Sequence, residues 1–69
     1  MTHTNRVWRK SIGARLIDVA AIVVVSEALV QRWEVGKRQP SAEQAHAWRQ
    51  ALKSLQERSE ARRSVAREL

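Results

Sequence analysis

Residues 26–35 (SEALVQRWEV) carry side chains whose types and spacing suit the edges of nucleic-acid bases. If this segment is a helix, Val30 and Trp33 lie three residues apart on one side and face the core. The opposite, exposed side then holds Glu27, Ala28, Gln31 and Arg32. Arginine can bond guanine in a bidentate fork, glutamine suits adenine, glutamate can accept from cytosine, and alanine can touch the thymine methyl. This face therefore has the chemistry to contact base pairs in a major groove.

Four further residues have the chemistry to contact phosphate. The Ser26 hydroxyl can cap the helix by accepting a bond from a free amide of the first turn, and a helix N-terminus also favours a nearby phosphate. Lys37 and Arg38 follow the helix in a turn that begins with glycine, and Arg15 lies near the start of the preceding segment. Such contacts would fix the register on a duplex without reading its sequence. The alternative for Lys37 and Arg38 is a solvated basic loop.

The composition favours a polyanionic partner and carries no sign of catalysis. Thirteen Lys and Arg face seven Asp and Glu, so the 69-residue chain has a formal net charge of +6, and a positive field of this kind attracts polyanions. The chain has no cysteine, and His3 and His46 lie far apart without a carboxylate cluster, so we expect no metal site. Neither a catalytic constellation nor a glycine-rich phosphate cradle is recognisable. We therefore expect no enzyme activity and no cofactor.

Two glycines and one proline divide the chain into the segments that must position these residues. Gly13, Gly36 and Pro40 separate residues 1–12, 14–35 and 41–69. The last segment is the clearest helix, because Ser41 and Gln44 have the spacing of a capping box directly after Pro40. An apolar stripe at helical spacing follows, formed by Ala45, Trp48, Leu52 and Leu55. Residues 56–69 contain strong helix formers but little to bury, so they either extend this helix or fray.

The middle segment is ambiguous when local preference alone is considered. Residues 16–25 (LIDVAAIVVV) are rich in β-branched side chains, which favour a strand. A lone strand without a partner makes no sheet, however, and Val19, Ala20 and Val23 also fit one face of a helix. We therefore predict a short helix followed by a turn.

Residues 26–41 (SEALVQRWEVGKRQPS) resemble the recognition helix and following loop of the lambdoid-repressor and Cro type of helix-turn-helix, the Xre family. The resemblance spans roughly residues 8–41, about half the chain. Without a gap, Ala20 falls on the small residue of the family's second helix and Gly13 on the end of its first helix. There are two departures: Leu16 replaces a phosphate-contacting glutamine, and Val24 replaces the glycine of the turn. Because a β-branched residue resists positive φ, we expect either a different backbone path at Val24 or a helix that extends before bending.

The resemblance implies a fold class and residue roles. It implies an all-α helix-turn-helix bundle of four to five helices with a long C-terminal helix, comprising a domain over residues 1–55 and a charged extension or frayed tail over residues 56–69. Glu27, Ala28 and Arg32 fall on base-contacting positions, and Arg32 is our first choice; its alternative is an ordinary surface salt bridge. The resemblance also implies an ion pair between Arg9 and Glu34. The residues expected in the core are Trp8, Val19, Ala20, Val30, Trp33, Trp48 and Leu52.

Two features leave alternatives open. The three tryptophans are expected in the core, and their rival use is a stacking platform for single strands. The stripe of Trp48, Leu52 and Leu55 is either a homodimer seam or packs against the protein's own helices. A dimer would match a palindromic site with half-sites about one helical turn apart. The tail arginines, which either contact DNA or solubilise the helix, are Arg58, Arg62, Arg63 and Arg67.

From these observations we expect a cytoplasmic, sequence-specific regulator that binds double-stranded DNA, as a repressor rather than an activator. The longest apolar run, residues 19–25, is far shorter than the roughly 20 residues of a membrane span, and the N-terminus lacks a secretory pattern. One alternative is a protein-interaction module on the same fold, with a toxin, a polymerase or another regulator as partner. A second alternative is an architectural or recombination-directionality factor, which binds DNA in arrays and bends it.

Overall fold

The structure is a computed structural model that describes the backbone of residues 2–68 and the side chains of residues 4–64. Over this range the chain forms four α-helices and no strand. The helices are α1 (Thr2–Ser11), α2 (Leu16–Val23), α3 (Glu27–Glu34) and α4 (Ala42–Glu68). The prediction of an all-α bundle with a long C-terminal helix is confirmed. None of the described helices has the length and apolar character that a membrane span requires.

The boundaries of α3 and α4 follow from local hydrogen bonds that the sequence predicts. The Ser26 hydroxyl accepts a bond from the backbone amide of Leu29 at 3.1 Å and so caps α3. At the start of α4, the Ser41 hydroxyl accepts from the Gln44 amide at 3.1 Å, and Gln44 Oε1 accepts from the Ser41 amide at 3.0 Å. This reciprocal pair is the predicted capping box.

The middle segment is helical despite its β-branched composition. Val19 and Ala20 are buried on the inner face of α2, and α2 packs against both α3 and α4. Burial of this apolar face outweighs the preference of valine and isoleucine for strands, because helix stability in a protein comes mainly from packing. The predicted short helix followed by a turn is therefore present.

Helices α1, α2 and α3 all end in the same hydrogen-bond pattern. In each, an amide two or three residues past the helix end bonds a carbonyl five residues back: Ala14 to Arg9, Val25 to Ala20 and Lys37 to Arg32. This motif needs a residue in the left-handed region just after the helix. Gly13 and Gly36 take that conformation with φ of 71° and 79°.

Val24 takes the third of these positions, with φ 65° and ψ 51°. Both sequence-based expectations for this turn are wrong: α2 ends at Val23 rather than extending, and the backbone keeps the left-handed path that a glycine would take. The reason is that Val25 must return to the core, against which it packs, and the left-handed residue turns the chain there. The result is a strained valine that is 85% exposed.

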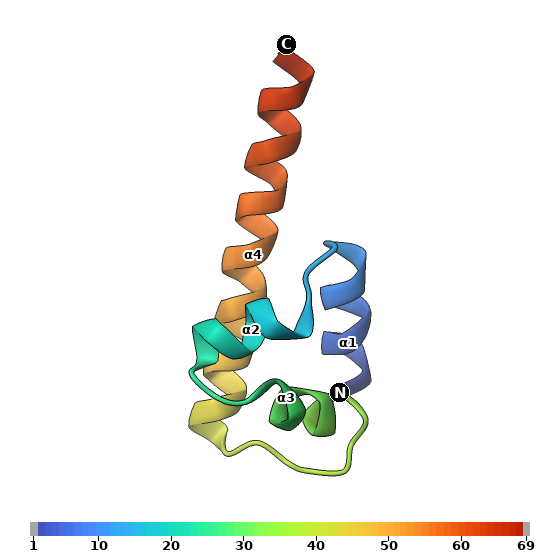
Figure 1. The fold of residues 1–69 in the computed structure, drawn as a ribbon, viewed down its shortest axis with the longest axis vertical. Helices are drawn as coiled ribbons and strands as arrows, with labels where there is room; N and C mark the ends of the chain where they lie inside the picture. The colour runs from blue at the N-terminus through green and yellow to red at the C-terminus, as the bar shows by residue number, and fades with distance from the viewer. Residues whose placement is uncertain (1, 69) are drawn as a thin grey trace.

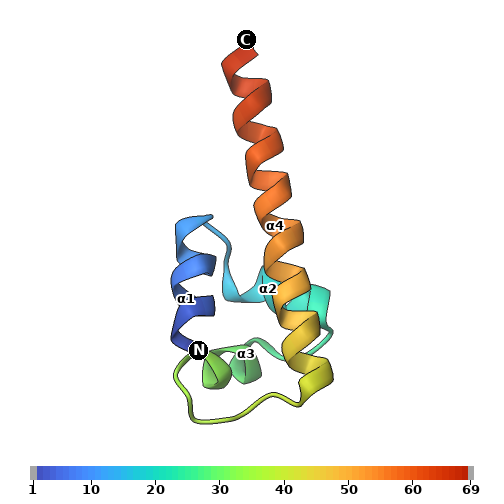
Figure 2. The ribbon, with the colours of Figure 1, turned by 180° about the vertical axis from the view of Figure 1, so that it is seen from behind.

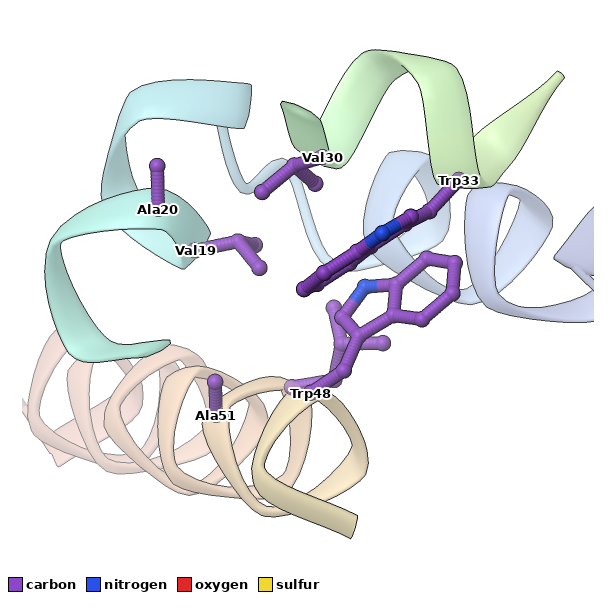
Figure 3. Close-up of a cluster of buried hydrophobic side chains, with 7 residues drawn as sticks. Val19, Ala20, Val30, Trp33, Trp48 and Ala51 are labelled. Atoms are coloured by element: carbon purple, nitrogen blue, oxygen red, sulfur yellow. The ribbon is translucent and has the colours of Figure 1, made fainter. Parts of the chain in front are cut away.

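The core lies between α2, α3 and the first half of α4 (Figure 3). Its buried members are Val19, Ala20, Val30, Trp33, Trp48, Ala51 and Leu52. The rings of Trp33 and Trp48 are tilted by 43° with centroids 5.4 Å apart, a favourable arrangement for an aromatic pair. Within the described residues Trp48 Nε1 has no hydrogen-bond partner, and in Figure 3 it lies on the side of its ring that faces Trp33.

Helix α4 extends well past the rest of the bundle. Figures 1 and 2 show its orange and red C-terminal half rising alone, at the opposite end of the molecule from α3. The molecule is accordingly elongated, with extents of 43 × 19 × 18 Å. Of the two alternatives for residues 56–69, the structure has a helix that continues to Glu68.

Candidate nucleic-acid interface

The candidate interface is the outer face of α3 with the basic turn that follows it. Val30 and Trp33 are buried at 0% and 1% exposure, and they hold α3 against the core. The four predicted base-contacting residues are all exposed: Glu27, Ala28, Gln31 and Arg32. The division into an inner and an outer face that the spacing predicts is therefore present.

An ion pair between Arg9 and Glu34 anchors the end of α3. Arg9 Nε donates to Glu34 Oε2 at 2.5 Å and Nη2 donates to Oε1 at 3.0 Å, while Nη1 donates to the Ala14 carbonyl at 2.9 Å. The two side chains are 12% and 3% exposed. The hydrogen bonds to Glu34 raise the pKa of Arg9 further above its ordinary value. One arginine thus joins α1, the loop before α2 and the end of α3, in the pairing that the resemblance implies.

Within residues 4–64, no acidic side chain neutralises the cations of the candidate interface. Lys37 and Arg38 are exposed, and their amides both bond the Arg32 carbonyl, which places them directly after α3. Among residues 4–64, the ion pairs are Arg9–Glu34 and Arg15–Asp18, so Arg32, Lys37 and Arg38 have no acidic partner there. Arg32 therefore makes no surface salt bridge, its alternative role, with any residue among 4–64.

Arg15 has a local role that the sequence-based interpretation missed. Its Nη2 lies 3.2 Å from Asp18 Oδ1, and its backbone amide donates to Asp18 Oδ2 at 3.0 Å, so the pair caps α2. Hydrogen bonds from the Arg15 side chain and backbone lower the pKa of Asp18 below its ordinary value. The spacing of opposite charges three residues apart is a signal that could have revealed it. Arg15 remains 77% exposed in its side chain, so a phosphate contact stays a prediction.

Two other residues that the sequence analysis singles out, Leu16 and Trp8, pack against the core. Leu16, which replaces the family's glutamine, is partly buried and packs against the core. Trp8 also packs against the core but stays partly exposed, and its Nε1 donates to Gln56 Oε1 at 2.7 Å. This bond ties α1 to α4 across 48 residues of sequence, a separation at which no local pattern predicts it.

The possible dimer seam on α4 is buried within the chain at two of its three residues. Trp48 and Leu52 are 1% and 0% exposed and belong to the chain's own core, and Leu55 packs against that core. They are covered because α2 packs on the first half of α4 and the Trp33 ring, which α3 supplies, lies against Trp48. The alternative of internal packing is the one that the structure has. Burial of Trp33 and Trp48 also removes these two rings from any platform on which bases could stack, while Trp8 stays partly exposed.

The class of protein that the fold defines is a small all-helical bundle compatible with a helix-turn-helix. Comparison with protein-family models, with curated proteins and with solved structures gives no match.

Proposed function

We propose that this chain binds double-stranded DNA in a sequence-specific manner, with α3 in the major groove, and acts as a transcriptional repressor. The observation that carries the proposal is the outer face of α3. There Glu27, Ala28, Gln31 and Arg32 are exposed together, while the helix is held from behind by a buried apolar side and an ion pair. A recognition helix needs both features, because its base contacts discriminate between base pairs only when the helix is held rigidly in place.

The distribution of charge supports a duplex as the ligand. The net charge is +6, and the exposed Lys37 and Arg38, which have no acidic partner among residues 4–64, lie directly after α3. A phosphate contact there would set the depth and register of α3 in the groove. Repression is the simplest regulatory outcome, since it requires only occupancy of a site.

The orientation of α4 separates its free half from this interface. The C-terminal half of α4 projects from the end of the molecule opposite α3 (Figure 2). A duplex bound at α3 therefore lies away from the projecting part of α4, within which Arg63 is exposed. Of the two alternatives for the tail arginines, solubilising the helix is the one this geometry favours.

Arg32→Ala is the decisive variant. The preferred duplex is first selected from a randomised pool, and binding of the variant to this duplex and to an unrelated duplex is compared at fixed salt. We expect a loss of roughly 10- to 100-fold on the preferred duplex and little change on the other, as a bidentate contact to guanine is worth about 1–3 kcal/mol of discrimination.

Arg63→Ala is the matched control, because it removes the same charge from an exposed position on the far half of α4. It should lower both affinities slightly and equally. Unchanged preference in Arg32→Ala, or an equal loss of preference in Arg63→Ala, would contradict base reading by α3. Selection of no preferred duplex at all would favour a protein-interaction role.

A further inference from the structure

A cleft at the end of the molecule opposite the projecting half of α4 has no part in the proposed interface. Its volume is about 550 Å³, which lies within the roughly 300–1,000 Å³ of small-molecule sites. The described residues that line it come from the start of α1, the loop between α3 and α4, and the first turns of α4. Figures 1 and 2 both show the start of α1 beside that loop. We call this space the α1–α4 cleft.

Part of the lining is apolar and already held in place. Trp48, Pro40 and Ala45 all line the α1–α4 cleft. Trp48 is 1% exposed, and its ring packs on that of Trp33, so this wall exists before a ligand arrives. Pro40 and Ala45 are only partly buried, which leaves apolar surface in contact with water. Covering that surface favours a ligand with an aromatic or aliphatic body.

Arg49 gives the α1–α4 cleft its charge. Among the described residues that line the cleft it is the only ionisable one, and it is exposed. The ion pairs within residues 4–64 do not include it, and no position three or four residues away from it on α4 is acidic. An anion is therefore attracted to this part of the cleft, whereas a cation is repelled by Arg49 and by the net charge of +6.

Polar side chains from two other elements complete the lining. Thr4 and Asn5 lie on α1, and Gln39 lies in the loop before α4. Their hydroxyl and amide groups can donate and accept hydrogen bonds, so they suit the carbonyl or carboxylate oxygens of a ligand. An apolar lining with a few such groups is the usual make-up of a small-molecule site. A DNA phosphate could contact Arg49, but it would leave the apolar part of the cleft unused.

We propose that the α1–α4 cleft binds a small organic anion. The aromatic or aliphatic body of this ligand lies against Trp48 and Pro40, and its acidic group pairs with Arg49. Such a ligand contacts α1, the loop after α3 and α4 together, so its binding also stabilises the fold. The binding needs no DNA, so it stands independently of the proposed function.

Fluorescence titration of the full chain with anilinonaphthalene sulfonate tests this proposal, because this probe combines aromatic rings with one negative charge. Its emission should rise on binding, with a dissociation constant of roughly tens of micromolar for a ligand of this size. Phenylnaphthylamine, which has the same rings without the sulfonate, is the neutral probe for comparison.

Arg49→Gln removes the charge but keeps much of the side chain, so it should weaken binding of the sulfonate by roughly three- to tenfold. It should leave binding of the neutral probe nearly unchanged. Arg63→Gln is the matched control, because it removes the same charge from an exposed position on the far half of α4. This variant should bind both probes as the unaltered chain does.

Nuclear magnetic resonance locates the bound probe without any substitution, so the result does not depend on how a variant folds. In the isotope-labelled chain, the Trp48 indole and the side-chain amides of Asn5 and Gln39 should shift when the sulfonate is added. The Trp8 indole and the Gln56 amide, which bond each other outside the cleft, should not shift.

Three outcomes would overturn the proposal. The first is the absence of binding up to millimolar sulfonate, and the second is a set of shifts centred on residues outside the α1–α4 cleft. The third is an affinity for the sulfonate that Arg49→Gln leaves unchanged or lowers no more than Arg63→Gln does, since the probe would then respond to the general charge of the chain or to none of it.

Discussion

Arg9 and Glu34 show how a single pair of charges can position an entire surface. Arg9 uses three donor nitrogens, two for Glu34 and one for the Ala14 carbonyl, and Glu34 is nearly inaccessible to solvent. A buried pair contributes little net stability compared with an apolar pair, but loss of one partner leaves the other charge without compensation. The pair therefore acts chiefly to specify where α3 ends and how it lies on α1.

Removing one member of this pair should destabilise the fold strongly. We expect Glu34→Ala to cost about 3–5 kcal/mol of unfolding free energy, since Arg9 would be left without its partner in a largely buried setting. Urea denaturation followed by tryptophan fluorescence measures this cost. Asp18→Ala breaks the exposed pair with Arg15 and should cost only about 1 kcal/mol, which includes the lost cap of α2. Similar costs for the two variants would argue against a special role for Arg9 and Glu34.

Replacing Val24 with glycine should raise the free energy of unfolding. The left-handed conformation costs an ordinary residue roughly 1–2 kcal/mol, and glycine recovers this, less the entropy that it loses on folding. We expect a net gain of about 0.5–1 kcal/mol, because the side chain is 85% exposed and buries little. Thermal unfolding followed by circular dichroism is the measurement. Val35→Gly, at an exposed position with negative φ, should instead be neutral or destabilising.

At the scale of the elements, α4 has two halves with different roles. Its first half is part of the core through Trp48, Ala51 and Leu52. Farther along, Gln56 accepts the bond from Trp8 and donates to Glu60 at 3.0 Å, and beyond it residues 60–64 are exposed. The bundle therefore ends, in energetic terms, near Gln56, while the helix itself continues.

A chain that stops after Glu60 should fold with nearly unchanged stability. Residues 61–64 are exposed, and the charge of Arg62 acts on Asp18 at a partly exposed site, so we expect the unfolding free energy to change by less than about 0.5 kcal/mol. Gln56→Ala in the full chain should cost more, about 1 kcal/mol, because the Trp8 indole loses its acceptor. Chemical denaturation of both variants checks the order. A shortened chain that unfolds more readily than Gln56→Ala would show that the far half of α4 supports the bundle.

At the scale of the whole molecule, the excess of positive charge sets how binding responds to salt. Each phosphate that a lysine or arginine neutralises releases counterions, and the logarithm of the binding constant falls by about 0.9 per tenfold rise in salt for each contact. Three candidate contacts, from Arg15, Lys37 and Arg38, predict a slope of about −2.7 from these side chains alone.

Neutralising the basic turn should flatten this dependence. For the double variant Lys37→Ala with Arg38→Ala, we expect the slope to become shallower by about 1.8, with equal effect on preferred and unrelated duplexes. Fluorescence anisotropy across a salt series is the measurement. The double variant Arg62→Ala with Arg63→Ala removes the same charge from the projecting half of α4 and should leave the slope nearly unaltered. If the two double variants behave alike, the turn after α3 is not the site of phosphate contact.

Much of this architecture could be predicted because it depends on interactions between near neighbours in the chain. The spacing of Val30 and Trp33 determines which side of α3 is apolar, and Ser26 and Ser41 cap their helices through bonds that span three residues. The polar outer face of α3 follows from the same spacing. Periodicity and capping act over a turn or two of helix, so they can be predicted from the sequence alone.

Only the tertiary structure decided what covers each apolar stripe. The stripe on α4 is equally suited to a partner or to the chain itself, and it is the packing of α2 and of the Trp33 ring that buries Trp48 and Leu52. The bond from Trp8 to Gln56 and the left-handed backbone at Val24 likewise depend on how distant segments meet. A periodic pattern predicts that one side of a helix avoids water, but the three-dimensional arrangement determines which surface covers that side.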